Sequence, residues 1–334
     1  MRLGINFASA FLAFSLALPV MGQAPAAANE DPGLDGVAAP LDLPLNGAQR
    51  EVFEHALQQR DYKTAESMLV EEAKLDPKSP RTARLLAIAG GIFFLDAQYL
   101  NSVIAWKKSE AIQPLDERSR FTLAMAEVRL NRRDWARAEL EKLAASQPQN
   151  PLFLYWLGRL DYDARHYEAA IARFQKVVEL DPKMMRAYDN LGLCHDYVGK
   201  IDDAIADYQH AIALNRQQTH PSPWPPLNLA IALTEKNRLA DADESLREAI
   251  RYDSRFAQAY YQLGRVLNRM NRDSEAVTTL KQAVTLDANY ADPHYLLARI
   301  YRRMGQTQLA KSETDQFVRL KNATQTSLHP NAEP

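Results

Sequence analysis

The chain has 334 residues, of which 46% are hydrophobic and 25% are charged, as is ordinary for a folded protein of one or two domains. Its formal net charge of −2 gives no reason to expect nucleic acid or a strongly anionic membrane as a partner. The single cysteine, Cys194, excludes an internal disulfide and any metal site built from several cysteines.

Residues 1–22 have the pattern of a secretory signal peptide. Arg2 precedes an apolar run from Phe7 to Leu18, Pro19 breaks that run, and small residues allow cleavage after Gly22. The run is too short for a comfortable transmembrane span. We therefore expect a periplasmic or secreted protein with a cleaved signal peptide. The alternative is an uncleaved amino-terminal anchor, and only then would we expect a membrane as partner.

Two further segments lack the pattern of packed helices. Residues 23–45 contain four prolines and little periodicity, which predicts a flexible linker. Residues 325–334 are too polar to pack and predict a disordered tail.

The region between them repeats with a period of 34 residues. Small residues in apolar helical contexts recur at this spacing, with a single step of 38 before residue 230: Gly90, Ala124, Gly158, Gly192, Ala230, Gly264 and Ala298. A second series has the same step and the same irregularity: Ser102, Ala136, Ala170, Ala204, Ala242, Ala276 and Ala310. Small side chains at fixed positions let two antiparallel helices approach closely. The two series therefore predict repeated helix pairs, with these residues at the helix crossings.

The unit 151–184 carries the fullest pattern, with Leu157-Gly158, Tyr162, Ala170, Phe174 and Pro182 at characteristic positions. This pattern resembles the tetratricopeptide repeat superfamily. The resemblance implies an all-α fold, a right-handed superhelical solenoid of antiparallel helix pairs with about seven to eight repeats. It covers nearly all of residues 46–324, in the units 46–79, 83–116, 117–150, 151–184, 185–218, 223–256, 257–290 and 291–324. The first helix of 46–79 matches poorly, so we leave open whether that unit is complete.

The resemblance also indicates where a ligand would bind. In this superfamily the first helices of the units line a concave groove, and their second, fifth, ninth, twelfth and thirteenth residues face inward. At or near such positions the sequence places aromatic residues and arginines: Tyr155, Arg159, Tyr162, Tyr197, Trp224, Tyr261, Arg265, Arg269, Tyr295, Arg299, Arg302 and Arg303. Arginine binds carboxylates through two hydrogen bonds, and tyrosine supplies rigid contact area. We therefore expect a protein or peptide partner with acidic side chains or a free carboxylate. The alternative is a solvated face with local ion pairs.

No motif indicates catalysis, a metal or a cofactor. Cys194, His195 and Asp196 are consecutive, and consecutive helical side chains point about 100° apart, so they cannot form a triad on one helix. The histidines show no metal-binding spacing, and no glycine-rich loop could hold a phosphate. We expect no enzyme activity and no cofactor.

The sequence favours an exported, non-enzymatic scaffold for protein–protein interaction that binds a partner segment in its groove. A membrane-tethered factor for envelope assembly or secretion is one alternative. Carbohydrate binding or catalysis that uses the aromatic groove is another.

The stretch THPSPWPPLN, residues 219–228, accounts for the single step of 38. It predicts a four-residue insertion at about 219–222, between the units 185–218 and 223–256. Its prolines then fall in a loop and in the first turn of the next helix, where a missing N–H costs little. Trp224 would stand beside this insertion as an apolar anchor in the groove.

Overall fold

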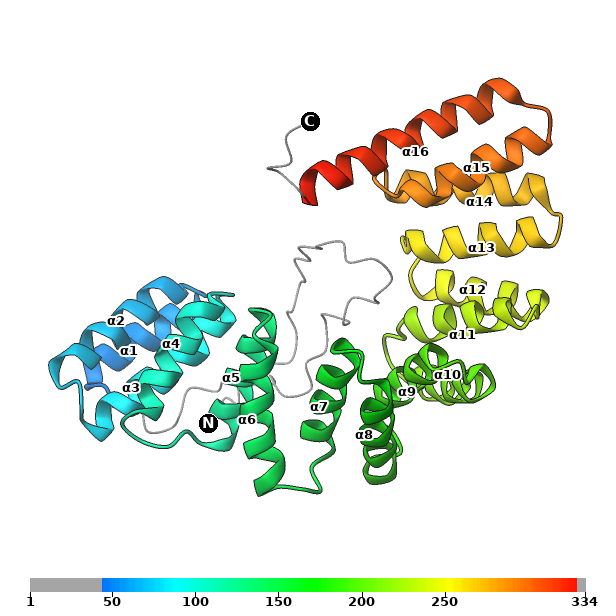
Figure 1. Ribbon diagram of the computed structural model, residues 1–334. Coiled ribbons are helices and arrows are strands. Elements are labelled where there is room, and N and C mark those ends of the chain that lie inside the picture. The colour runs from blue at the N-terminus through cyan, green and yellow to red at the C-terminus, as the bar shows by residue number, and fades with distance from the viewer. Residues whose placement is uncertain (1–43, 329–334) are drawn as a thin grey trace, which may run out of the picture. The chain divides into compact units, whose positions relative to one another are not determined.

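The computed structural model describes residues 44–328, and within them it contains sixteen α-helices and no strands, so the predicted all-α fold of repeated helix pairs is confirmed (Figure 1). The signal peptide predicted for residues 1–22 lies outside the described residues. The helices are α1 (Gly47–Gln58), α2 (Tyr62–Leu75), α3 (Pro80–Leu95), α4 (Tyr99–Glu110), α5 (Glu117–Arg129), α6 (Arg133–Ser146), α7 (Pro151–Asp163), α8 (Tyr167–Leu180), α9 (Met185–Tyr197), α10 (Ile201–Asn215), α11 (Trp224–Glu235), α12 (Leu239–Tyr252), α13 (Ala257–Arg269), α14 (Asp273–Leu286), α15 (Ala291–Arg303) and α16 (Thr307–Leu328).

The chain divides into two compact units, Met1–Leu160 and Asp161–Pro334, and α7 crosses the boundary between them. We call them unit 1 and unit 2. In each unit the odd-numbered helix of a pair packs against the even-numbered helix that follows it, as α3 packs against α4 and α13 against α14. Apolar side chains between the helices form the cores of both units.

Every helix pair is joined by a turn that contains one residue in the left-handed conformation. These residues have φ between 56° and 79° and lie at Arg60, Ala97, Asn131, Arg165, Gly199, Asn237, Asn271 and Gly305. The next residue in the chain donates its N–H back to the helix, as Lys200 does to the carbonyl of His195 at 2.8 Å. From Ala97 onward these residues follow the sequence period, including its one longer step. The left-handed turn residue therefore recurs with the same period as the two series of small residues.

Most of these turn residues carry a side chain, although glycine adopts positive φ at lower cost. We expect Ala97→Gly to raise the free energy of unfolding by about 1 kcal/mol, because it relieves the steric cost of a Cβ at φ 57°. The matched control is Ala138→Gly, at an exposed position inside α6, which should lower that free energy by about 1 kcal/mol. Urea unfolding measures both, and destabilisation by Ala97→Gly would contradict the assigned turn.

The small residues that recur in the sequence lie where the helices of a pair cross. A Cβ built at Gly90 would lie 2.7 Å from the Trp106 ring, and one built at Gly192 would lie 2.6 Å from the Tyr208 ring. The alanines of the second series from Ala136 to Ala276 are fully buried. Close approach of the two helices therefore depends on small side chains at these positions.

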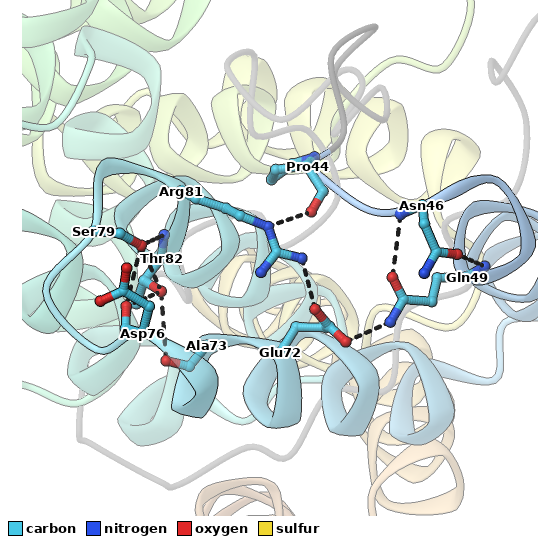
Figure 2. Close-up of polar contacts among 9 residues, drawn as sticks. All are labelled: Pro44, Asn46, Gln49, Glu72, Ala73, Asp76, Ser79, Arg81 and Thr82. Carbon is cyan, nitrogen blue, oxygen red and sulfur yellow. Dashed lines mark hydrogen bonds and ion pairs between the residues drawn. The ribbon is translucent and has the colours of Figure 1, made fainter.

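The first pair of helices is held by a polar bridge as well as by its apolar core (Figure 2). Asn46 caps α1 by accepting from the N–H of Gln49 at 3.0 Å. The Gln49 amide donates to Glu72 on α2, and Glu72 also accepts from Arg81 on α3 at 2.6 Å. Arg81 in turn donates to the carbonyl of Pro44 at 3.1 Å. Residues 46–79 therefore form a complete helix pair, although the first helix matches the repeat pattern poorly.

The structure differs from the sequence prediction at both ends of the array. Leu45, predicted in the linker, is only 8% exposed and packs in the core around α1–α3. Residues 325–328, predicted in the tail, continue α16 to Leu328. No proline or glycine lies between residues 307 and 328, so nothing in the sequence terminates this helix earlier.

The proline-rich insertion is fixed to the preceding helix. Asn215, the last residue of α10, is fully buried; it donates to the Ser222 carbonyl and accepts from the Ser222 N–H, both at 2.8 Å. Pro225 and Pro226 lie in the first turn of α11. The longer step between the repeats is thus due to a loop in unit 2 that is hydrogen-bonded to the end of α10.

Candidate functional site

The first helices of unit 2 form a continuous layer. Helices α9, α11, α13 and α15 contact one another in succession, whereas over the described residues no such contacts join the second helices α10, α12, α14 and α16. Helices that approach more closely on one side of the array make that side the inner one. We call the exposed surface of α9, α11, α13 and α15 the groove face.

Three arginines of the groove face have no carboxylate partner among the described residues. Arg265 donates to the amide oxygen of Gln262 at 2.7 Å, and its guanidinium carbon lies 5.8 Å from the centre of the Tyr261 ring. The guanidinium carbon of Arg299 is likewise 5.8 Å from the centre of the Tyr295 ring. Arg302 is exposed one turn further along α15. These three cations are therefore available to an anionic partner.

Arg269 and Arg303, also predicted for the groove, bind neighbouring helices instead. Arg269 donates to the carbonyl of Thr234 at 2.7 Å and to the side chain of Asn237 at 3.0 Å, which satisfies the end of α11.

Arg303 pairs with Asp273 and donates to the Asn268 side chain at 2.5 Å, so it links α15 to α13 and α14. Both arginines contribute to packing between repeats, and the charge of Arg303 is compensated by Asp273.

A pocket of about 380 Å³ lies between α13 and α15, lined by Asn268, Arg299, Arg302 and Arg303. Arg303 is neutralised by Asp273, so the uncompensated charge of the pocket comes from Arg299 and Arg302. Guanidinium groups in such an arrangement bind carboxylates or other oxyanions.

The predicted aromatic residues differ in how much surface they offer. Tyr197 and Tyr295 are each 51% exposed. Tyr197 also stacks on Tyr167, with ring centres 4.7 Å apart. Tyr155 and Tyr162 are only 6% exposed, so they are largely core residues and offer a ligand little contact area.

Two other predicted residues lie in less open surroundings. Trp224 is half-buried and packs edge-on against Phe256, with ring centres 4.7 Å apart, so it serves the core as well as the surface. Arg159 lies on α7 in unit 1 and is half-buried.

An acidic pair on the groove face was not singled out by the sequence analysis. Burial, together with the negative charge of Glu235 on α11, raises the pKa of Asp196 on α9 to about 6. Glu235 is the thirteenth residue of 223–256, so counting inward positions in that unit would have found it. Asp196 and Glu235 therefore place negative charge on the groove face at α9 and α11, whereas the arginines without carboxylate partners among the described residues lie on α13 and α15.

The described residues contain no arrangement that points to catalysis. Cys194 is fully buried, and Nδ1 of His195 lies 2.7 Å from Asp207, which joins α9 to α10. Within residues 44–328 no three histidine, cysteine or acidic side chains are placed to hold a metal ion. No helix in that range is long and apolar enough to cross a membrane.

The family comparisons cover part of the array. A family model described as "Tetratricopeptide repeat" matches residues 121–182 and 157–219, and one described as "TPR repeat" matches residues 264–305. No curated protein matches this sequence.

Solved structures share the fold at low sequence identity. A tetratricopeptide repeat protein from Parabacteroides merdae is 17% identical, covering 79% of this chain and 98% of its own, with a TM-score of 0.59. The pilus biogenesis factor PilW is 19% identical, covering 65% and 95%, with a TM-score of 0.54. The Cut9–Hcn1 assembly of the APC/C is 17% identical, covering 78% and 50%, with a TM-score of 0.56. The repeated helix pairs, the family matches and these structures agree, and the chain is a tetratricopeptide repeat protein.

Proposed function

We propose that this protein is an exported scaffold that binds an acidic partner segment on the groove face of unit 2. The tetratricopeptide fold is one of protein–protein interaction scaffolds, typically without enzyme activity. The observation that carries the specific proposal is the set of exposed arginines Arg265, Arg299 and Arg302. Among residues 44–328 they have no carboxylate partner, and Arg299 and Arg302 line a pocket.

The charge pattern supports an orientation for the bound segment. Acidic side chains or a terminal carboxylate would bind over α13 and α15, where guanidinium groups form two hydrogen bonds with a carboxylate. Asp196 and Glu235 would repel the same end of the segment, so its less acidic part would lie over α9 and α11. Tyr197 and Tyr295, both half-exposed, supply rigid contact area along the way.

Export is supported by the pattern of residues 1–22 alone, which combines an early positive charge, a short apolar run and small residues. Sequencing the amino terminus of the protein from a soluble envelope fraction tests it. A chain that begins near Gln23 is expected, and a chain that keeps residues 1–22 in the cytosol would contradict export.

The binding proposal predicts that charge reversal on the groove face weakens binding of the partner. Arg265→Glu with Arg299→Glu should weaken affinity about tenfold or more, because a carboxylate would then face repulsion where it had a charge-assisted hydrogen bond. Affinity capture from envelope extract, with mass spectrometry, identifies the partner, and titration with acidic peptides bearing free or amidated ends measures affinity.

The matched control is Lys311→Glu with Arg319→Glu, which makes the same charge change at exposed positions of α16. Equal affinity of the wild type and the Arg265/Arg299 variant for the captured partner would remove the proposed role of the groove arginines.

A further inference from the structure

Three large apolar side chains are exposed on the helices α4 and α6 of unit 1. Leu100 and Ile104 on α4 are 59% and 43% exposed, and Trp135 on α6 is 50% exposed. We call them the outer patch. Both helices are the second members of their pairs, whereas the first helices α3 and α5 contact each other.

An ion pair connects the two helices that carry the outer patch. Nζ of Lys107 on α4 lies 2.6 Å from Oε1 of Glu139 on α6. Ile104 precedes Lys107 by three residues and Trp135 precedes Glu139 by four, and side chains at these spacings share a helix face. Leu100 extends the same face of α4 by one further turn. The three apolar side chains therefore lie on the faces of α4 and α6 that this ion pair connects.

Basic residues surround the patch. Lys108 lies one turn from Ile104, and Arg132 lies one turn from Trp135, with its guanidinium carbon 5.3 Å from the centre of the indole ring. Arg133 is also exposed nearby, as are two acids, Asp96, four residues before Leu100, and Asp134, next to Trp135. Lys107 is exposed as well, but it is paired with Glu110 and Glu139. Among the described residues Lys108 and Arg132 have no carboxylate partner, so two uncompensated cations lie beside the apolar side chains.

A patch of this size and charge fits a lipid surface better than a protein. Stable protein interfaces use about 20–30 residues on each side, far more than this patch offers. A membrane interface, by contrast, accepts a few shallowly inserted side chains, and tryptophan is enriched there because its ring is apolar and its N–H is polar. Lysine and arginine beside the inserted groups gain attraction to anionic headgroups.

We propose that the outer patch docks unit 1 reversibly on an anionic phospholipid surface. Leu100, Ile104 and Trp135 enter the headgroup region, and Lys108, Arg132 and Arg133 contact lipid phosphates. Arg132 is held beside the indole ring, so insertion of Trp135 brings a guanidinium group to phosphate level. This docking is peripheral and needs no membrane-spanning helix.

The test uses the full chain and vesicles of phosphatidylcholine, alone or mixed with phosphatidylglycerol. Brominated phosphatidylcholine quenches tryptophan fluorescence on contact, and Trp135 is the exposed member among the tryptophans of the described residues. We expect quenching with the anionic vesicles that is lost in Trp135→Phe. Because the readout belongs to Trp135, membrane attachment through the amino-terminal residues would not imitate it.

Charge reversal tests the cationic part of the surface. Lys108→Glu with Arg132→Glu should weaken binding to anionic vesicles about tenfold or more, and raised salt should weaken wild-type binding. The control is Lys63→Glu with Lys78→Glu, the same charge change at exposed positions of unit 1 away from the patch. Absence of Trp135-dependent quenching, or equal effects of the two charge reversals, would overturn the proposal. Binding of a protein ligand by the outer patch, with no binding to either kind of vesicle, would also overturn the proposal.

Discussion

Gly264→Leu is expected to lower the free energy of unfolding by about 1–3 kcal/mol through overpacking. Gly264 lies on α13 opposite α14, and even a Cβ at this position would lie 2.5 Å from Cγ of Leu280. Leu280 is itself fully buried, so it has no free space to move into. The helices of this pair would have to separate, and part of their contact would be lost.

Urea unfolding followed by circular dichroism measures this cost. Gly47→Leu serves as the matched control, because no atom lies within 4 Å of a Cβ at Gly47 and the residue is exposed at the start of α1. That variant should change stability by less than about 0.5 kcal/mol. Equal stability of the two variants would show that the assigned crossing point between α13 and α14 is wrong.

Glu127→Gln is expected to stabilise the protein above neutral pH and to leave its stability in acid almost unchanged. Glu127 on α5 is fully buried, and neither oxygen of its carboxyl group has a hydrogen-bond partner among the described residues. Burial raises its pKa from 4.5 to about 7; the positive charge of Lys107 opposes this rise and the negative charge of Glu139 adds to it.

The direction of the pH dependence follows from the raised pKa. Between about pH 4.5 and pH 7 the folded chain keeps a proton on Glu127 that the unfolded chain has lost. Stability from this group is therefore complete below about pH 4.5 and is lost as the pH rises through 7. Glutamine mimics the protonated acid at every pH, so the gain at pH 8 should be about 3 kcal/mol.

Glu139 provides a control with the opposite sign. Burial would raise its pKa, but hydrogen bonds from Lys107, Lys142 and Arg120 outweigh burial and lower it. Glu139→Gln should therefore destabilise the protein at neutral pH, and this loss should shrink as the pH falls through the acidic range. Unfolding midpoints of both variants from pH 4 to pH 8 separate the two cases, and parallel curves would contradict the assignment.

The sequence predicted the helix pairs because each repeat needs small side chains at the helix crossing. Gly90, Gly192 and Gly264 lie where any larger residue would meet a buried side chain of the paired helix. That requirement is local to about 20 residues, so it recurs with the repeat and can be seen in one sequence. The longer step before Ala230 was visible for the same reason, since it displaces every later crossing by the same amount.

The availability of the groove arginines depended on residues much further along the chain. Arg269 and Arg303 also occupy inward positions of their units, as Arg265 and Arg299 do. Arg269 nevertheless binds Thr234 and Asn237, and Arg303 binds Asp273, and these partners lie about 30 residues away in the chain. Spacing along a helix gives the direction of a side chain but not the neighbour that it meets in the next repeat.

Contacts between repeats also determine which of the aromatic residues are buried. Tyr162 and Tyr197 occupy neighbouring first helices and contact each other, but Tyr162 lies beneath the surface and Tyr197 remains half-exposed. The sequence by itself determined the repeat and its small crossing residues, because these follow from chain geometry within one repeat. Only the tertiary structure decided which charged and aromatic side chains stay open to a partner, because that depends on contacts between repeats.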